Sequence, residues 1–123
     1  MDTDAAGIYH WTTAFRLAEA AEAALHTALG IAELTFGATP RVRVSAEFRR
    51  SLRFNDPVDV TLAVAAVGRT SVRYALTLAL DGETAVEGEI VSCLIDRETR
   101  RAVPWPDHVR AALEAGGAVS SPP

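Results

Sequence analysis

The spacing of apolar residues changes once along the chain, close to Pro40. Before that point, the stretch from Trp11 to Leu29 contains no proline or glycine and is rich in alanine, which predicts a helix. Gly30 is well placed to end this helix. Its apolar positions recur every three or four residues and form a face of mostly small side chains: Ala14, Leu17, Ala18, Ala21, Leu25 and Ala28. A helix with such a face can lie very close to a neighbouring backbone.

After Pro40, apolar residues alternate with polar ones, which is typical of half-buried strands. Four runs show this period: residues 41–48, 58–67, 71–80 and 84–95. The breaks between them are turn-forming sequences: Asn55-Asp56-Pro57, Gly68-Arg69-Thr70 and Asp81-Gly82. We therefore predict an α+β fold in which a long antiparallel sheet wraps around one central helix.

Length and composition narrow the class of protein. The chain of 123 residues has room for one compact domain, which we place at residues 1–115, with a short helix from Pro106 to Leu113 and a disordered tail over residues 116–123. The net charge of −4 argues against nucleic acid as a partner. No stretch reads as a secretory signal or a membrane span. The single cysteine, Cys93, fits a reducing compartment, so we expect a cytoplasmic protein.

The opening sequence DTDAAGIYHW, followed by a helix, resembles the 4-hydroxybenzoyl-CoA thioesterase-like group of the hot-dog fold. That group carries an Asp-x-Asp-x-x-Gly stretch, which matches Asp2, Asp4 and Gly7, and a recurrent helix glutamate, which matches Glu19. The turn at Asp56, the VGRTSVRY segment and the proline-led AVPWPDHVRAAL segment continue the resemblance to Leu113. Residues 1–115 are therefore expected to form a hot-dog thioesterase domain.

The resemblance implies hydrolysis of an acyl thioester with no metal or organic cofactor. Asp4 lies at the position of the group's carboxylate, which either attacks the carbonyl carbon or activates water. Gly7 allows a sharp turn, and the backbone N–H of Trp11, at the expected helix start, is the candidate oxyanion donor. His10 either touches the thioester, orients Asp4, or is simply a partly buried polar side chain. Thus Asp4, Gly7, His10 and Trp11 are the candidate catalytic residues.

The same resemblance suggests where the substrate binds. Phe15, one turn after Trp11, would form a wall of the acyl pocket or ordinary core, and Glu19 would line that pocket or face solvent. Ser71 matches a position near the pantetheine arm, although a turn serine often only bonds its own backbone. All twelve basic residues are arginine, and Arg69 and Arg73 flank Ser71, so they are candidates for CoA phosphate contacts. The alternative for these arginines is a solvated strand face.

The expected substrate is an acyl-CoA or an acyl group on a carrier protein. The resemblance implies a homo-oligomer, a dimer or a tetramer, whose active site lies between subunits. Two other functions stay open: a non-catalytic module that binds acyl-CoA, and a hydratase or dehydratase that pairs His10 with Asp4. In one respect the sequence departs from the group, because a first strand usually precedes the aspartate motif, which here begins at Asp2. If that strand is absent, we expect the sheet to have an unprotected edge and Asp4 to lie on a loose end.

Overall fold

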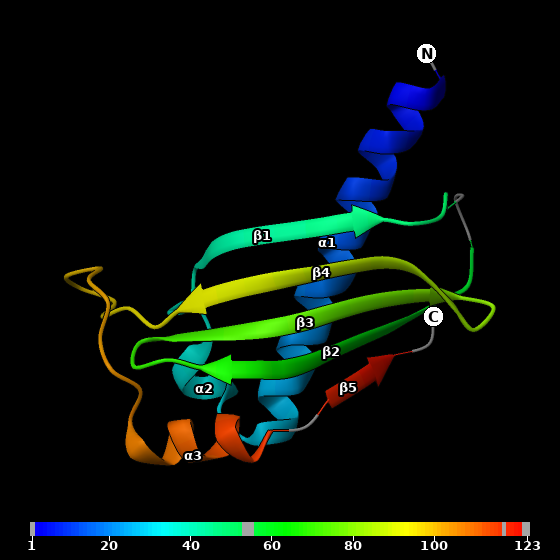
Figure 1. The fold of residues 1–123 in the computed structure, drawn as a ribbon. Helices are drawn as coiled ribbons and strands as arrows, with labels where there is room; N and C mark the ends of the chain where they lie inside the picture. The colour runs from blue at the N-terminus through cyan, green and yellow to red at the C-terminus, as the bar shows by residue number, and fades with distance from the viewer. Residues whose placement is uncertain (1, 53–55, 117, 122–123) are drawn as a thin grey trace.

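A computed structural model describes the backbone of residues 2–52, 56–116 and 118–121 and the side chains of residues 13–52 and 56–116. A curved sheet lies over one long helix, with shorter helices at its lower edge (Figure 1). In chain order the elements are α1 (Asp2–Leu29), α2 (Ala32–Thr35), β1 (Arg41–Phe48), β2 (Val58–Val67), β3 (Ser71–Leu80), β4 (Glu83–Cys93), α3 (Asp107–Ala115) and β5 (Ala118–Ser121). The predicted α+β fold, an antiparallel sheet around a central helix, is confirmed.

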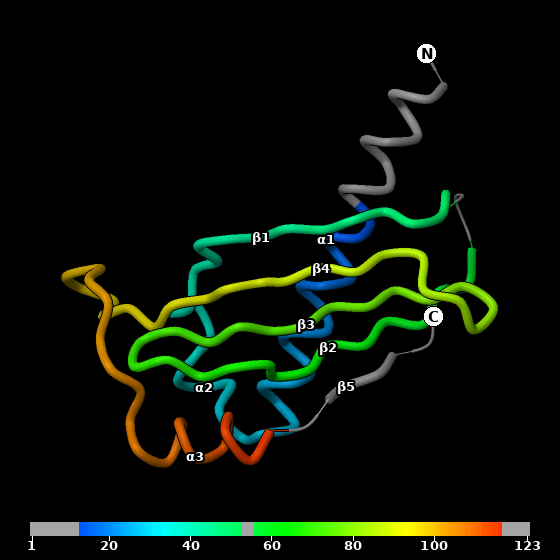
Figure 2. Tube along the Cα trace, in the orientation of Figure 1, coloured from blue at the N-terminus to red at the C-terminus, as the bar shows by residue number. Residues whose placement is uncertain are grey.

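The strands are ordered β1-β4-β3-β2-β5, and every neighbouring pair is antiparallel (Figure 2). β3 and β4 are joined by the two residues Asp81 and Gly82, since Leu80 pairs with Glu83. Asp81 and Gly82 have φ values of 53° and 81°. Two positive φ values are what a type I′ turn requires, and this turn matches the right-handed twist of the strands. The Asp-Gly sequence was thus a reliable hairpin signal.

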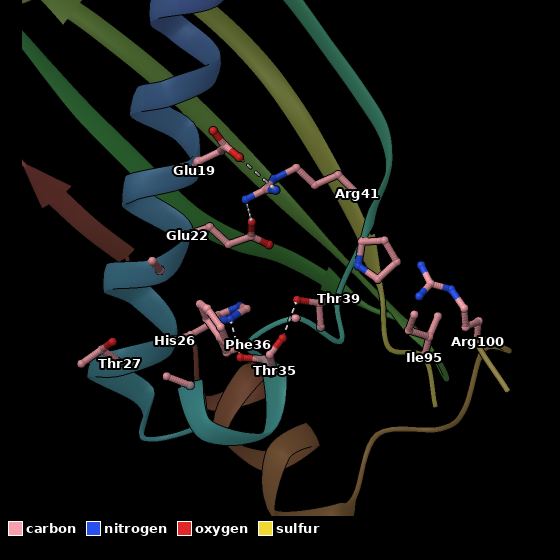
Figure 3. Close-up of a pocket in the computed structure, with 14 residues that line it drawn as sticks. Glu19, Glu22, His26, Thr27, Thr35, Phe36, Thr39, Arg41, Ile95 and Arg100 are labelled. Carbon is pink, nitrogen blue, oxygen red and sulfur yellow. Dashed lines mark hydrogen bonds and ion pairs between the residues drawn. The ribbon is translucent and has the colours of Figure 1, made fainter. Parts of the chain in front are cut away.

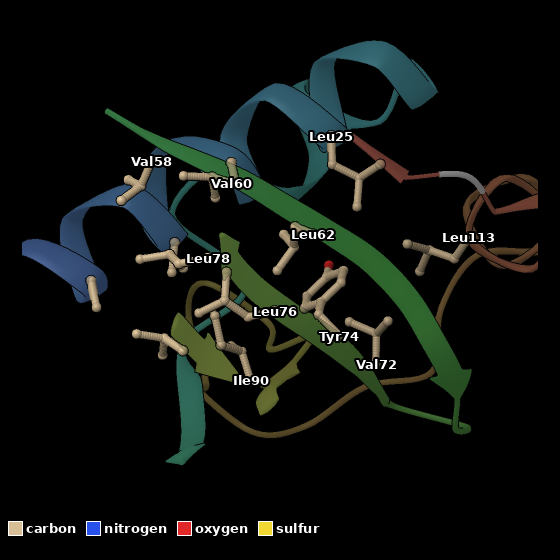
Figure 4. Close-up of a cluster of buried hydrophobic side chains, with 14 of the residues drawn as sticks. Leu25, Val58, Val60, Leu62, Val72, Tyr74, Leu76, Leu78, Ile90 and Leu113 are labelled. Carbon is tan, nitrogen blue, oxygen red and sulfur yellow. The ribbon is translucent and has the colours of Figure 1, made fainter. Parts of the chain in front are cut away.

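The core lies between α1 and the inner face of the sheet. Ala14, Ala18 and Ala21 are each buried, and they leave room for large side chains from the strands. Figure 4 shows this layer, with Leu25 of α1 facing the sheet and Leu113 of α3 at one end. Large strand side chains that are fully enclosed include Leu62, Tyr74, Leu78, Val86 and Ile90. Of the predicted helix face, only Leu17 and Ala28 are not fully buried.

Two segments differ from the sequence prediction. α1 begins at Asp2 rather than Trp11, because two acidic residues suit the positive end of a helix and Ala5 and Ala6 favour helix. The tail expected to be disordered contains β5, which pairs with Val60–Ala63 of β2. Its Ala118–Ser121 sequence is short and gives no alternation by itself, but the exposed edge of β2 supplies hydrogen-bonding partners. β5 therefore covers part of the β2 edge of the sheet.

Gly88 of β4 lies directly against the backbone of β1. A Cβ atom at this position would overlap the carbonyl oxygen of Ser45 and lie 3.2 Å from Cα of Ala46. We expect Gly88→Ala to lower the free energy of unfolding by about 2 kcal/mol, because β1 must move to admit the methyl group.

The change is measured as the shift of the urea unfolding midpoint. Gly82→Asn is the matched control, because nothing lies within 4 Å of its would-be Cβ and asparagine tolerates the φ of 81°. Equal losses of stability for the two variants would contradict the steric explanation.

Candidate functional site

One flank of α1 carries buried polar side chains that face the start of β1. The carboxylate of Glu22, only 4 % exposed, accepts hydrogen bonds from Arg41 and from the Ser92 hydroxyl of β4, the latter at 3.0 Å. Burial raises the pKa of the Glu22 carboxyl, although the Arg41 charge and these hydrogen bonds partly oppose the shift. Helix and sheet are thus joined by a buried charged pair.

Arg41 also contacts two residues that the sequence indicated for substrate binding. Its guanidinium carbon lies 5.6 Å from the centre of the Phe15 ring, and its Nη1 lies 3.6 Å from the Glu19 carboxylate. Its Nε–H is buried and has no acceptor among the described residues. An unmet buried donor costs about 1–3 kcal/mol. Phe15, Glu19 and Glu22 are therefore brought together through one arginine.

Below this cluster, His26 forms a hydrogen-bond chain of fixed direction. The Thr35 hydroxyl donates to the Ile31 carbonyl at 3.1 Å, so its contact of 2.8 Å with His26 Nδ1 requires a proton on Nδ1. His26 Nε2 then accepts from the Tyr74 hydroxyl at 2.6 Å. Burial and, to a lesser degree, the Arg41 charge lower the pKa of His26 to about 4. With both ring nitrogens occupied, His26 is not available as a base.

A cavity of about 500 Å³ opens beside these groups (Figure 3). Glu19, Glu22 and His26 line it from α1, and Thr39 and Arg41 line it from the opposite wall. Phe36, 82 % exposed, and Arg100 also border it. The cavity therefore has a mixed polar and apolar lining, with Glu22 and His26 among its buried polar side chains, and is open to solvent.

A second concentration of charge lies at the end of the sheet where β2 turns into β3. The backbone there is tied to the segment after β4, because Leu94 N–H donates to the Thr70 carbonyl at 2.8 Å and Trp105 N–H donates to the Arg69 carbonyl at 3.2 Å. Figure 1 shows this turn beside the loop that leads to α3. The exposed arginines of this region are Arg69, Arg97, Arg100 and Arg101.

None of these four arginines forms an ion pair with a carboxylate of the described residues. By contrast, Arg73, the second candidate for phosphate contact, is bound to Glu89 at 3.0 Å. Ser71 lies in the same region, and its backbone carbonyl accepts a hydrogen bond of 3.0 Å from the Trp105 indole. No hydrogen bond or ion pair of the described side chains joins this arginine group to Phe15 or Glu19.

The side chains of Asp4, His10 and Trp11 lie outside the described residues, as does any contact of theirs, and their roles stay predictions. Gly7 falls within α1. Sequence reasoning missed Glu22, His26 and Arg41. Glu22 and His26 directly follow Ala21 and Leu25 of the apolar helix face, but Glu19 follows Ala18 in the same way and is exposed, so this position gave no reliable signal. Arg41 gave no signal either.

Residues 1–113 match the sequence model of the Thioesterase-like superfamily. The chain belongs to this superfamily. The resemblance drawn from the aspartate–glycine motif and the hot-dog fold are thereby confirmed. No curated protein matches this thioesterase-like chain in sequence.

Solved structures share the fold. A protein from Pseudomonas aeruginosa strain PAO1 is 25% identical with a TM-score of 0.72, over 85% of this chain and 76% of that one. A gentisyl-coenzyme A thioesterase is 20% identical with a TM-score of 0.71, over 81% of each chain. A thioesterase from Thermus thermophilus, complexed with coenzyme A and zinc, is 21% identical with a TM-score of 0.56, over 64% of this chain and 58% of that one.

Two further observations concern the described part of this thioesterase-like chain. None of its helices combines the length and apolarity needed to cross a bilayer. Within the same residues, no three histidine, cysteine, aspartate or glutamate side chains gather in a way suited to a metal ion.

Proposed function

We propose that the protein is an acyl-CoA thioesterase, which hydrolyses an acyl thioester to a free acid and the CoA thiol. Membership of the Thioesterase-like superfamily supports thioester hydrolysis in general. The observation that favours CoA is the group of four arginines without carboxylate partners at one end of the sheet: Arg69, Arg97, Arg100 and Arg101.

The electrostatics of this arginine group fit a ligand with phosphates. Of the other described arginines, Arg49, Arg50, Arg73 and Arg110 are paired with glutamates, whereas the exposed Arg16 and Arg43 form no ion pair with a described carboxylate. The loop after β4, which carries three of the four arginines of the group, also carries the exposed Asp96 and Glu98, so the four arginines outnumber the carboxylates of this loop by two, and guanidinium groups attract anions. Guanidinium groups also bind phosphate oxygens through two hydrogen bonds at once. The nucleotide end of CoA carries the phosphates that such a group would hold.

The names of two similar structures agree with this substrate class. One is a gentisyl-coenzyme A thioesterase, and another is a thioesterase complexed with coenzyme A. Both share the fold of this chain, and their sequence identities of 20% and 21% leave the acyl group open. CoA, rather than a particular acid, is therefore the part of the substrate that we propose.

In the proposed reaction, a water oxygen bonds to the acyl carbon, the carbon–sulfur bond breaks, and a proton ends on the CoA sulfur. Asp4 acts either by taking the water proton or by attacking first to form an anhydride that water then hydrolyses. The negative oxygen of the tetrahedral intermediate needs donors without other partners, and the backbone N–H groups of a helix are free only in its first turn. In this structure Trp11 lies inside α1, so its N–H becomes a free donor only if the residues before it unwind from the helix. Gly7, the weakest helix former among them, is where such unwinding is easiest.

The arginine group gives a test of the substrate. We expect Arg100→Gln combined with Arg101→Gln to raise KM for acyl-CoA about 30-fold, because two charged hydrogen bonds to phosphate are lost. The side chains of both arginines are exposed, so the fold should be unaffected. Hydrolysis of an acyl N-acetylcysteamine thioester, which has no nucleotide, should stay within about twofold of the unmodified protein.

The control is Arg49→Gln combined with Arg50→Gln, since both arginines already bind glutamates. An equal rise of KM in the control would show a general charge effect. A loss restricted to acyl groups on a carrier protein would identify that protein as the substrate. Binding of acyl-CoA without thiol release would favour the non-catalytic module, and action on an enoyl-CoA without thiol release would favour the hydratase.

A further inference from the structure

One aromatic side chain at the edge of the cavity is almost entirely exposed to water. Phe36 is 82% exposed, more than any other large hydrophobic side chain of the described residues, and it borders the cavity. A phenylalanine ring is stabilised when it is removed from water, and no described side chain covers this one. Figure 3 shows Phe36 beside α2 and Arg100 on the other side of the cavity, next to Ile95. An uncovered aromatic ring and an arginine thus border the same cavity.

Arg100 occupies a backbone position that residues with a side chain rarely adopt. Its φ of 62° lies in the left-handed region, where glycine or asparagine is usual. The hairpin around it is closed by two hydrogen bonds, from the Arg100 N–H to the Asp96 carbonyl at 2.8 Å and from the Asp96 N–H to the Arg101 carbonyl at 2.9 Å. Strained residues of this kind gather where a ligand is held. The backbone that carries Arg100 is therefore fixed at the cavity.

Arg97 fastens this hairpin to the segment that carries Phe36. Its Nη2 donates a hydrogen bond to the Leu34 carbonyl at 3.1 Å. The Ile95 N–H donates to the Ala38 carbonyl at 2.9 Å, so the two bonds lie on either side of Phe36 in the chain. The backbones that carry the aromatic ring and the arginine are thus held together without a ligand, which lowers the ordering cost of binding one.

The charges at the cavity differ between its two sides. Glu19 and Glu22, on α1, are both paired with Arg41. Arg100 has no carboxylate partner among the described residues. An anionic group is therefore attracted to the side of Arg100, and a flat ring is able to stack on Phe36. A nucleotide combines the two, because its base stacks on aromatic side chains and its phosphates bind guanidinium groups.

We propose that Phe36 stacks against the adenine ring of CoA and that Arg100 binds a phosphate of the same nucleotide. This inference rests on the proposed thioesterase function. It extends that function by giving the base, as well as the phosphates, a binding residue and by placing the nucleotide at the cavity.

The position of the cavity along α1 agrees with the shape of CoA. His26, which lines the cavity, lies about 22 Å along the helix axis from Trp11, at 1.5 Å per residue. The Trp11 N–H is the candidate donor to the thioester oxygen, and the pantetheine arm separates that thioester from the nucleotide. The cavity is therefore suited to the nucleotide end of CoA and is distant from the reacting carbon.

The test is the affinity of the protein for CoA, measured by calorimetry. We expect Phe36→Ala to weaken CoA binding about tenfold, because the stacking of the base is lost. Phe36→Tyr keeps the ring and should bind CoA within about twofold of the unmodified protein, whereas Phe36→Leu keeps only apolar volume and should behave as Phe36→Ala does. The ring is exposed, so the fold should not depend on it. Equal losses of affinity in the tyrosine and alanine variants would overturn the proposal.

A second ligand and a second variant exclude a general effect on the surface. 4′-Phosphopantetheine, which is CoA without its nucleotide, should bind to Phe36→Ala and to the unmodified protein equally well. Val42→Ala is the matched control, since Val42 is 63% exposed but does not line the cavity. This variant should bind CoA as the unmodified protein does. A loss of affinity in the control, or a loss for 4′-phosphopantetheine in Phe36→Ala, would overturn the proposal.

Binding needs no turnover, which separates this inference from the proposed function. If thioesters are hydrolysed but Phe36→Ala binds CoA normally, the inference fails and the proposed function stands. If CoA binding depends on Phe36 but no thioester is hydrolysed, the proposed function fails and the inference stands. Absence of CoA binding would overturn both. A change of oligomeric state in Phe36→Ala, measured by light scattering, would assign the ring to a contact between subunits and overturn the inference.

Discussion

Asp4→Asn is expected to lower kcat for acyl-CoA hydrolysis about 10³-fold, because an amide neither accepts the water proton nor attacks the thioester. Asparagine has the shape of aspartate, so the affinity for substrate should change little. Release of free thiol, followed with a thiol-reactive dye over short, long and aromatic acyl-CoAs, measures the effect.

Asp2→Asn is the matched control, since it changes the other acid of the same motif by the same atom. It should retain activity within about threefold of the unmodified protein. Similar decreases of kcat in the two variants would show that the effect comes from the loss of negative charge near the N-terminus and not from a specific role of Asp4. Full activity of Asp4→Asn would remove the carboxylate mechanism altogether.

His26 should make the protein less stable as the pH falls. Its folded pKa of about 4 lies below the ordinary value of 6.5, since the buried ring resists charging. As the pH falls from about 6.5 to about 4, the unfolded state therefore takes up a proton that the folded state does not. The free energy of unfolding should decrease over this range by about 3 kcal/mol through this one group, given about 1.4 kcal/mol per pKa unit.

The comparison with His26→Gln isolates that contribution, because glutamine does not titrate. The variant should start less stable at pH 7 but lose about 3 kcal/mol less on acidification, as measured by urea unfolding. Glu22 and Arg41 face His26, and the raised pKa of Glu22 acts in the opposite direction. Both remain in the variant, so their effects largely cancel. His108→Gln, on the exposed side of α3, is the control and should behave as the unmodified protein does.

Much of the fold was predictable from local patterns. The strands at residues 41–48, 58–67 and 71–80 begin and end where the alternation of apolar and polar residues does. The turn at Asp81-Gly82 was predictable because its backbone angles favour those two residues. The start of α1 at Asp2 was not predictable, because residues 2–10 are compatible with both a loop and a helix. The strand β5 was not predictable either, because it forms only by pairing with the edge of β2.

The candidate site was predictable only in part. The family and its motif followed from the order of short signals along the chain, and Glu19 and Phe15 proved to share a partner. The identity of that partner, Arg41, depends on how β1 passes over α1, which alternation does not reveal. Likewise, the arginines at positions 69 and 100 are far apart in sequence. Only the structure shows that the loop after β4, which carries Arg100, is hydrogen-bonded to the β2–β3 turn, which carries Arg69.

The alanines of α1 also bear on how this protein evolves. Ala14, Ala18 and Ala21 are each at most 3% exposed and allow the helix to pack tightly beneath the sheet. Almost any mutation at these positions adds volume, and inserting extra methylene groups in a filled core costs about 1–3 kcal/mol. Natural variation should therefore be restricted on the helix and concentrated in the leucine, valine and isoleucine residues opposite, where exchanges of shape are tolerated. New acyl specificities would then arise mainly through substitutions in the strands, while the small side chains of the helix stay unchanged.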